Sequence, residues 1–367
     1  MSDGFLTSPQ QRDLFQILEH DRSGAQIVVE LKGSVDIAAL KESLSTVVER
    51  HEIFQTDYTV IPGMKYPLQV LAGANLEWSE HELSESSLTE IAKVQNEEFQ
   101  KSGNSSTVYI SLVKEAENKH HIILCCHALA MDYQAVMTML KEWSYCYDAI
   151  HGSGCPELEE PLQYIDYAAW LDELQMSDDA FEGNKFWSNY CKDFSPRFSF
   201  ALEEPTTERA YTQHSQVVNL PSVYTEQLNA YCSQHDLRAQ DVLCSMWLLI
   251  VSRMSGQSNQ AVSFRVEGRD DEQLQSVMGI VQKDIPICVD ITEFKSFLPL
   301  VKQLSRQLTS IQSWQDFYKW PECWREEASE SLDIGFAFYN SASTLTCSNS
   351  ELSWTPKHIQ LLLLYTS

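Results

Sequence analysis

The sequence lacks any apolar run of the roughly 18–20 residues that a membrane-spanning helix needs. Its first residues, MSDGFLTSPQQ, are polar and acidic, whereas a secretory signal peptide begins with basic residues and continues with apolar ones. Both absences favour a cytoplasmic protein.

Positive charge is scarce as well, because 26 Lys and Arg stand against 52 Asp and Glu, for a formal net charge of −26. Such a surface repels nucleic acids and anionic membranes, so we expect neither as a partner. The ten cysteines include no C-x-x-C pair and lie mostly in apolar segments. We therefore expect buried free thiols rather than disulfides or zinc ligands.

Hydrophobic periodicity predicts two successive cycles of strands and helices. The first helix is expected to begin at Ser8 and Pro9, and the helix within 35–54 to bury Leu40, Leu44 and Val48. Further strands are expected at 25–33, 107–115, 120–129, 214–220, 261–268, 283–291, 335–340 and 358–366. Further helices are expected at 133–152, 162–194, 223–236, 239–256 and 294–314. Turn-rich composition indicates connections at 152–162 and 195–210.

Residues 121–136, HIILCCHALAMDYQAV, combine three patterns. The apolar run predicts a buried strand, the following loop holds His127 and Asp132, and the remainder continues as an amphipathic segment. A histidine and a carboxylate at the end of a buried strand mark this loop as the candidate site.

This stretch resembles the active-site strand and loop of the condensation domains of peptide synthetases, whose pattern is His-His-x-x-x-Asp-Gly. His127 and Asp132 match the first His and the Asp. Ala128 stands at the position of the second His, which the family uses for chemistry, and Tyr133 stands at the position of the Gly. The resemblance implies the family's fold together with a reaction centre that lacks its imidazole.

Further stretches match the same family in order and approximate spacing over nearly the whole chain. They are SPQQRDLF at 8–15, VERHEIFQTDY at 48–58, YIDYAAW at 164–170, FRVEGRDDE at 264–272, MGIVQKDIPICVD at 278–290 and WQD at 314–316. The motif Tyr-x-Asp-x-Ala-x-Trp is kept at every fixed position. Gln55, Lys283 and Trp314 replace an Arg, an Asn and a His of the other motifs.

The resemblance implies an α/β fold of two chloramphenicol-acetyltransferase-like sandwich lobes, forming a V-shaped pseudo-dimer with a central tunnel. We expect an N-terminal lobe at 1–175, which carries the loop, and a C-terminal lobe at 176–367. Such domains usually continue several dozen residues beyond the point matched by LLLLYTS, so the second lobe is expected to lack its usual end. In the family, substrates tethered to carrier proteins by phosphopantetheine arms meet in the tunnel, where an amine attacks a thioester. No metal and no directly bound cofactor is implied.

The loop residues have structural as well as chemical interpretations. Because neighbouring side chains on an extended segment point to opposite faces, His127 is expected to point away from position 128 and to be buried and hydrogen-bonded. The alternative is a histidine that has taken over the missing base's role. Asp132 is expected to be a structural anion, which the resemblance pairs with Arg269 in a bridge between the lobes.

Tyr133, Lys283 and Trp314 are the candidates for residues that face the tunnel and its substrates. For both Trp314 and Trp170, packing in the core or between the lobes is favoured over stacking on a ligand. The cluster of Arg50, His51 and Glu52 is expected to fix a helix end.

Two other classes of site are less favoured. A metal site could draw on neighbouring His, Cys and Asp side chains: His120, His121, Cys125, Cys126, His127 and Asp132. Ligands two residues apart on one strand span too much length for a compact tetrahedral site. Acyl-CoA transferases of the same superfold use His-x-x-x-Asp, whereas His127 and Asp132 are five residues apart.

Three functions follow from the resemblance. The leading hypothesis is a condensation-like domain of a nonribosomal peptide, or hybrid peptide–polyketide, assembly line that is impaired in amide bond formation and recruits a carrier protein or a tailoring enzyme. The second is an active domain that joins carrier-bound substrates by positioning them, with unusual chemistry. The third is a degenerate structural spacer.

Overall fold

The computed structural model describes most of the chain. The described residues are 4–18, 24–83, 87–102, 107–152, 158–194, 196–198, 200, 216, 218–319, 324, 332, 334–340 and 344–360. The expected connection at 195–210 and most of the expected strand at 358–366 lie outside them.

The chain divides into two compact units. The first comprises Met1–Glu173, Glu267–Gln282 and Asn340–Leu363, and the second comprises Leu174–Val266, Lys283–Tyr339 and Leu364–Ser367. The first change of unit is close to the expected boundary at residue 175. Two later segments nevertheless belong to the first unit, so the second half of the chain contributes to both.

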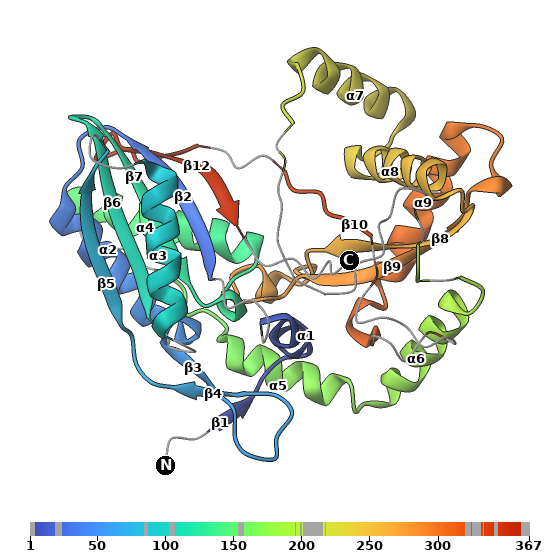
Figure 1. Cartoon of the computed structure of the whole chain (residues 1–367), viewed down its shortest axis with the longest axis horizontal. Helices are drawn as coiled ribbons and strands as arrows, with labels where there is room; N and C mark the ends of the chain where they lie inside the picture. The colour runs from blue at the N-terminus through green and yellow to red at the C-terminus, as the bar shows by residue number, and fades with distance from the viewer. Residues whose placement is uncertain are drawn as a thin grey trace. The chain divides into compact units, whose positions relative to one another are not determined.

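The first unit is built on a six-stranded sheet with the order β11-β12-β2-β7-β6-β5 (Figure 1). Its strands are β2 (Ala25–Lys32), β5 (Leu76–Glu82), β6 (Val108–Ala116), β7 (Lys119–Cys126), β11 (Leu345–Thr346) and β12 (Ser353–Gln360). Neighbouring strands are antiparallel except for β5 and β6. The central position of β7 explains its nearly continuous apolar sequence, because both of its faces are covered.

Helices cover the two faces of this sheet. Val29 and Leu31 of β2 belong to one core cluster with side chains of α2 (Ile37–Arg50) and α4 (Tyr133–His151). Val28, on the opposite face of the same strand, packs in a second cluster with side chains of α3 (Leu88–Ser102).

The sequence of α2 shows why it forms and how it packs. The Asp36 side chain accepts the backbone N–H groups of Ala38 and Ala39, at 2.9 and 3.1 Å, and so caps the first turn. Leu40, Leu44 and Val48 are buried as the periodicity predicts.

A second, three-stranded sheet in this unit was not predicted. It has the order β1-β4-β3, with β1 (Gly4–Leu6), β3 (Thr56–Thr59) and β4 (Leu68–Leu71). The helix α1 (Pro9–Leu18) follows β1 and begins where the sequence predicts. Ser8 Oγ accepts the N–H of Gln11, and the Gln11 side chain accepts the N–H of Ser8, which together form a capping box.

The second unit contains a three-stranded sheet with the order β10-β8-β9. Its strands are β8 (Asn259–Val266), β9 (Lys283–Asp290) and β10 (Gly335–Phe336), and its helices are α6 (Asp178–Cys191), α7 (Ser222–His235), α8 (Ala239–Ser255) and α9 (Phe297–Gln312). The core of this unit joins the strands to α6, α8 and α9. Residues 218–220, which were expected to lie in a strand, form none. Within the described part of the chain, no helix is long and apolar enough to cross a membrane.

Candidate functional site

The loop that carries the candidate site follows β7 directly. β7 ends at Cys126, residues Ala128–Ala130 form the 3-10 turn η2, and α4 begins at Tyr133. The carbonyl of His127 accepts the N–H of Ala130 at 2.9 Å. Positions 127 and 128 are therefore not successive strand residues, and the alternation expected from an extended segment does not apply to them.

His127 is buried and held by its ring. The ring centroid lies 4.4 Å from that of Tyr58 and 6.1 Å from that of Phe99. Its Nδ1 accepts the backbone N–H of Leu129 at 3.1 Å, so this contact assigns the proton of the neutral ring to Nε2. Burial lowers the pKa of His127 to about 3. At neutral pH the ring therefore has one nitrogen engaged as an acceptor and the other protonated.

Two side chains from other elements clamp the turn after His127. The carbonyl of Leu129 accepts hydrogen bonds from Gln11 Nε2 at 3.1 Å and from the Tyr58 hydroxyl at 3.2 Å. Gln11 also donates to the Tyr58 hydroxyl at 3.1 Å. Gln11 was not predicted to reach the loop. The capping box in SPQQ was the available signal, because it fixes the orientation of this residue at the start of α1.

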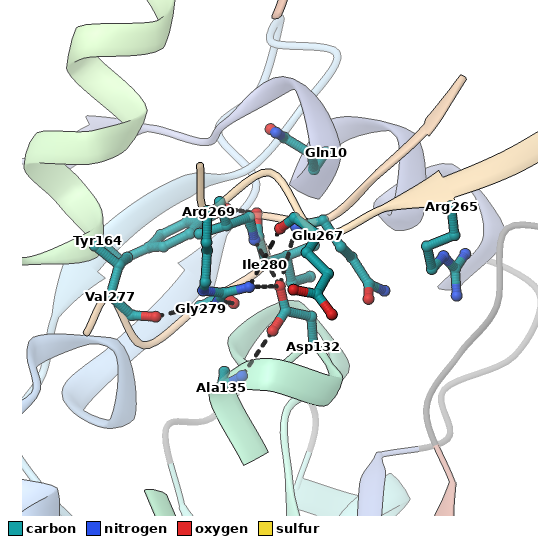
Figure 2. Close-up of polar contacts among 12 residues, drawn as sticks. Gln10, Asp132, Ala135, Tyr164, Arg265, Glu267, Arg269, Val277, Gly279 and Ile280 are labelled. Carbon is teal, nitrogen blue, oxygen red and sulfur yellow. Dashed lines mark hydrogen bonds and ion pairs between the residues drawn. The ribbon is translucent and has the colours of Figure 1, made fainter. Parts of the chain in front are cut away.

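Asp132 is the most extensively bonded residue of the loop, and its partners all lie in the first unit (Figure 2). Its Oδ1 accepts the N–H of Ala135 at 2.8 Å and so caps α4. Its Oδ2 accepts Arg269 Nη1 at 2.8 Å and the N–H groups of Val281 and Gln282 at 2.9 and 3.0 Å. The side chain is fully buried. These contacts engage both oxygens as structural acceptors.

The ion pair with Arg269 is present, but it does not join one compact unit to the other. Arg269 lies in Glu267–Gln282, which belongs to the first unit together with Asp132. Its Nη2 donates to the carbonyls of Val277 and Gly279, each at 3.1 Å. The ion pair therefore holds the segment Glu267–Gln282 against the start of α4.

Tyr164 supports the same segment from the helix α5 (Tyr164–Leu174). Its hydroxyl donates to the carbonyl of Ile280 at 2.8 Å and lies 2.8 Å from Ser8 Oγ. Gly279 has φ of +145°, and a Cβ added to it would lie 1.9 Å from the Tyr164 ring. The glycine of this motif is therefore required both by its backbone conformation and by the aromatic ring against it.

Tyr133 is the first residue of α4 and is half-buried. Its hydroxyl donates to the carbonyl of Asn340 at 3.1 Å. Burial, with the charge of Glu267 as a second cause, raises the pKa of this phenol. Tyr133 is therefore a neutral donor bonded within the first unit.

The other two candidates for tunnel-facing residues belong to the second unit. Lys283, at the start of β9, forms an ion pair with Asp316. The ring of Trp314 stacks on Phe186 at 5.6 Å between centroids, and its carbonyl accepts Trp187 Nε1 at 2.8 Å. Trp314 is thus packed against the core of its own unit, and the proposed role of these two side chains toward a substrate stays a prediction.

The remaining candidates have partners that do not form a metal centre. Among the described residues, no three His, Cys, Asp or Glu side chains are grouped to hold a metal ion. His121 Nε2 lies 2.6 Å from a carboxylate oxygen of Glu115. His51 Nε2 lies 2.8 Å from Glu142, which also pairs with Arg50 at 3.5 Å.

Two smaller observations complete the survey of the candidates. The backbone N–H of Glu52 donates to the Gln163 side chain at 3.0 Å, so the segment after α2 is held to the segment before α5. Trp170, for which core or interface packing was the leading interpretation, is 44% exposed.

Ala128 defines what the loop can do chemically. Its methyl group can neither accept a proton nor donate a hydrogen bond, and the residue is only 3% exposed. His127 is committed to Leu129, and Asp132 is committed to Arg269 and three amides. The loop therefore keeps a rigid, well-bonded shape without a side chain poised to take a proton.

The comparison with protein families decides the assignment. The model described as "Condensation domain" matches residues 3–345. The chain belongs to the condensation domain family. Its mixed α/β fold is the chloramphenicol-acetyltransferase-like fold of these domains, as the sequence motifs predicted.

Relatives and solved structures agree with this assignment. The chain is 24% identical over 311 residues to a chondramide synthase of Chondromyces crocatus and 26% identical over 326 residues to bacitracin synthase 1 of Bacillus licheniformis, matches that cover 79% and 84% of the chain. It covers only 8% and 6% of those relatives, so it spans less than a tenth of their length.

Among solved structures, the starter condensation domain of rhizomide synthetase superposes with a TM-score of 0.82 at 13% identity, covering 98% of this chain and 83% of that one. The first condensation domain of the calcium-dependent antibiotic synthetase gives a TM-score of 0.79 at 14% identity, covering 97% and 85%. At this level of identity the likeness establishes the fold alone.

Proposed function

We propose that this condensation domain works in a nonribosomal peptide, or hybrid peptide–polyketide, assembly line, that it is impaired in ordinary amide bond formation, and that it recruits a carrier protein or a partner enzyme. The observation that carries the proposal is the state of the loop. Ala128 occupies the position of the family's catalytic histidine. The adjacent His127 has a neutral imidazole that carries its proton on Nε2, and its Nδ1 accepts the backbone N–H of Leu129. A general base would be worth about 10²–10⁴-fold in rate, and the loop offers none.

The retained scaffold favours a binding role over a spacer role. Asp132 and Arg269 still hold the start of α4 and the segment Glu267–Gln282 together. Both oxygens of the buried Asp132 carboxylate are hydrogen-bonded, whereas the buried Arg269 Nε has no hydrogen-bond partner among the described residues. A buried pair of this kind is costly to keep. A loop that is held in shape without the reactive group supports a role in recognition rather than in turnover.

The proposed partner is a carrier protein whose phosphopantetheine arm bears an acyl or peptidyl group, with a tailoring enzyme as the other class of partner. The arm is then a tether of the substrate and not a cofactor of this domain. With a net charge of −26, the chain would have to receive an acidic carrier on a locally apolar or basic surface. A cytoplasmic location is part of the same proposal.

Binding and turnover can be separated in one experiment. A panel of phosphopantetheinylated carrier domains would be titrated into the protein by calorimetry, once with the free arm and once with an acyl group on it, while intact-mass spectrometry follows the thioester. The proposal predicts that at least one carrier binds and that its acyl group stays in place. Failure of every carrier and of candidate tailoring enzymes to bind would favour the spacer, and transfer of the acyl group to an added amine acceptor would favour an active domain.

A further inference from the structure

The motif Tyr-x-Asp-x-Ala-x-Trp on α5 has a buried half and an exposed half. Tyr164 and Ala168 are buried, and the Tyr164 hydroxyl donates to the carbonyl of Ile280. Asp166 and Trp170 are exposed, and because they are four residues apart they share the outer face of the helix. Contacts within the first unit therefore account for the buried half, while the exposed half faces outward.

Trp170 is exposed although a tryptophan ring gains much from burial. The residue is 44% exposed, and among the tryptophans that the structure describes it is the only exposed one. Its ring has one aromatic neighbour, Tyr167, at 6.0 Å between centroids. Tryptophan carries a large apolar area and is enriched among the residues that anchor protein interfaces. The exposed ring is therefore a candidate anchor for another molecule.

Two carboxylates flank this indole on the same face of α5. Asp166 lies about one turn before Trp170 and Glu173 about one turn after it, and both are exposed. In the described part of the chain, neither carboxylate has a hydrogen bond or an ion pair. The Arg12 side chain of α1 reaches α5, but it donates to both oxygens of Asp172, at 3.2 and 3.0 Å. The α5 face, defined by Asp166, Trp170 and Glu173, thus presents a ring between two unpaired negative charges.

Trp78, elsewhere in the first unit, shows which group completes such an arrangement. The Lys41 ammonium lies 4.9 Å from the centre of its ring and 3.0 Å from a carboxylate oxygen of Glu80. The same oxygen accepts Trp78 Nε1 at 3.0 Å, so ring, carboxylate and cation form one set. No Lys or Arg among the described residues lies over the ring of Trp170. A cation supplied by another molecule would complete the same set there.

We propose that the α5 face is a docking surface for a basic segment of a partner protein, which places an Arg or Lys over the Trp170 indole and pairs it with Asp166 and Glu173. The net charge of −26 attracts a basic partner from a distance and repels an acidic one. This surface therefore receives a tailoring or other partner enzyme and not an acidic carrier. The proposal rests on the proposed recruiting function and chooses between its two classes of partner.

A model peptide tests the recognition without the partner itself. The probe is an alanine-based helical peptide with two arginines four residues apart, compared with the same peptide carrying citrulline, the uncharged isostere of arginine, or glutamate. Binding to the whole chain is followed by the indole N–H signals in ¹H–¹⁵N NMR spectra, in which Trp170 is assigned from the variant Trp170→Leu. The arginine peptide should shift the Trp170 signal and bind more weakly as the salt concentration rises from about 50 to about 500 mM. The citrulline and glutamate peptides should leave the signal in place.

Substitutions test each group of the α5 face. Trp170→Leu, Asp166→Asn and Glu173→Gln should each weaken binding of the arginine peptide about two- to fivefold. The matched control is Tyr145→Leu, which removes an exposed aromatic ring from α4 and should leave binding unchanged. Because all four positions are exposed, the variants should keep the unfolding midpoint of wild type.

Two results would overturn the proposal. One is equal binding of the citrulline and arginine peptides, or binding by Trp170→Leu and Asp166→Asn at the level of Tyr145→Leu. The other is a Trp170 indole that is shielded from a dissolved paramagnetic agent in the free protein, because a covered ring cannot receive a partner. These measurements use no carrier and no enzyme, so the α5 face can fail while recruitment is observed, and recruitment can fail while the α5 face binds the peptide.

Discussion

Removal of the Asp132 carboxylate would test how the loop keeps its shape. Four donors converge on it, from Ala135 and Arg269 at 2.8 Å each and from Val281 and Gln282 at 2.9 and 3.0 Å. Removing one partner of a buried ion pair costs about 3–5 kcal/mol, and losing a helix N-cap costs about 1 kcal/mol. Because the two effects share one side chain and overlap, we expect Asp132→Ala to lower the free energy of unfolding of the first unit by about 4 kcal/mol.

The assay is urea unfolding followed by circular dichroism, with hydrogen exchange of β2 and β7 to assign the transition to the first unit. Since domains of this kind have total stabilities of about 5–15 kcal/mol, the loss should be large and easily measured. The double variant with Arg269→Met should be more stable than Asp132→Ala alone, because it removes the unpaired guanidinium. If Asp132→Ala lowers the free energy of unfolding by less than about 1 kcal/mol, the pair contributes no more than a solvent-exposed ion pair does, and the interpretation of Asp132 as a buried structural anion is wrong.

Three further predictions concern neighbouring residues. The imidazole of His127 should stay neutral, with its proton on Nε2, from pH 8 to pH 5 in ¹⁵N NMR spectra, because burial lowers its pKa to about 3. In the unfolded chain the ring takes up a proton near pH 6.5, so the folded protein loses stability as the pH falls from 6.5 to 3. His127→Gln should make this loss of stability smaller, and an unchanged loss between pH 6.5 and 3 would contradict the prediction. Gly279→Ala should cost about 3 kcal/mol or more in thermal or urea unfolding, because its Cβ would overlap the Tyr164 ring at a φ of +145°; a wild-type midpoint would show that the contact relaxes freely. Burial raises the pKa of Glu30, but hydrogen bonds from Lys357 and Lys32 outweigh it and lower the pKa to about 2. The stabilising contribution of the Glu30 carboxylate is therefore complete above about pH 4.5 and is lost as the pH falls towards 2. Glu30→Gln should make stability depend less on pH in that window, and the same dependence as in wild type would argue against pairing of Glu30 with the two lysines.

Local patterns in the sequence predicted the parts of the fold that depend on local physics. The helix predicted to begin at Ser8 and Pro9 is α1, and α4 ends at His151 with Gly152 as its C-cap, close to the predicted range 133–152. Asp132 and Arg269 were paired from their motifs, because both motifs survive in this chain.

Contacts between distant segments left no comparable signal in a single sequence. The strand β12 joins β2 although more than three hundred residues separate them, and it contains Pro356 and a bulge that hide its periodicity. The segment Glu267–Gln282 gives no sign in its own composition that it belongs to the first unit. Nor does the motif position of Trp314 reveal that its ring stacks on Phe186.

The state of His127 was predicted for an incomplete reason. Strand alternation was expected to turn it away from position 128, but the strand ends at Cys126. The ring is instead fixed by Tyr58, Phe99 and the N–H of Leu129. Burial, rather than strand geometry, makes it a poor base.

The central claim is that the loop keeps the family's scaffold without its reactive group. The most direct test supplies carrier-bound donor and acceptor substrates and counts amide product by mass spectrometry for wild type, His127→Ala and Ala128→His. The account predicts no enzyme-dependent product from wild type, and the same result for His127→Ala. The variant Ala128→His, which places an imidazole at the position of the family's catalytic histidine, should form product. Product from wild type that disappears in His127→Ala would contradict the account, because it would make the buried histidine the working base.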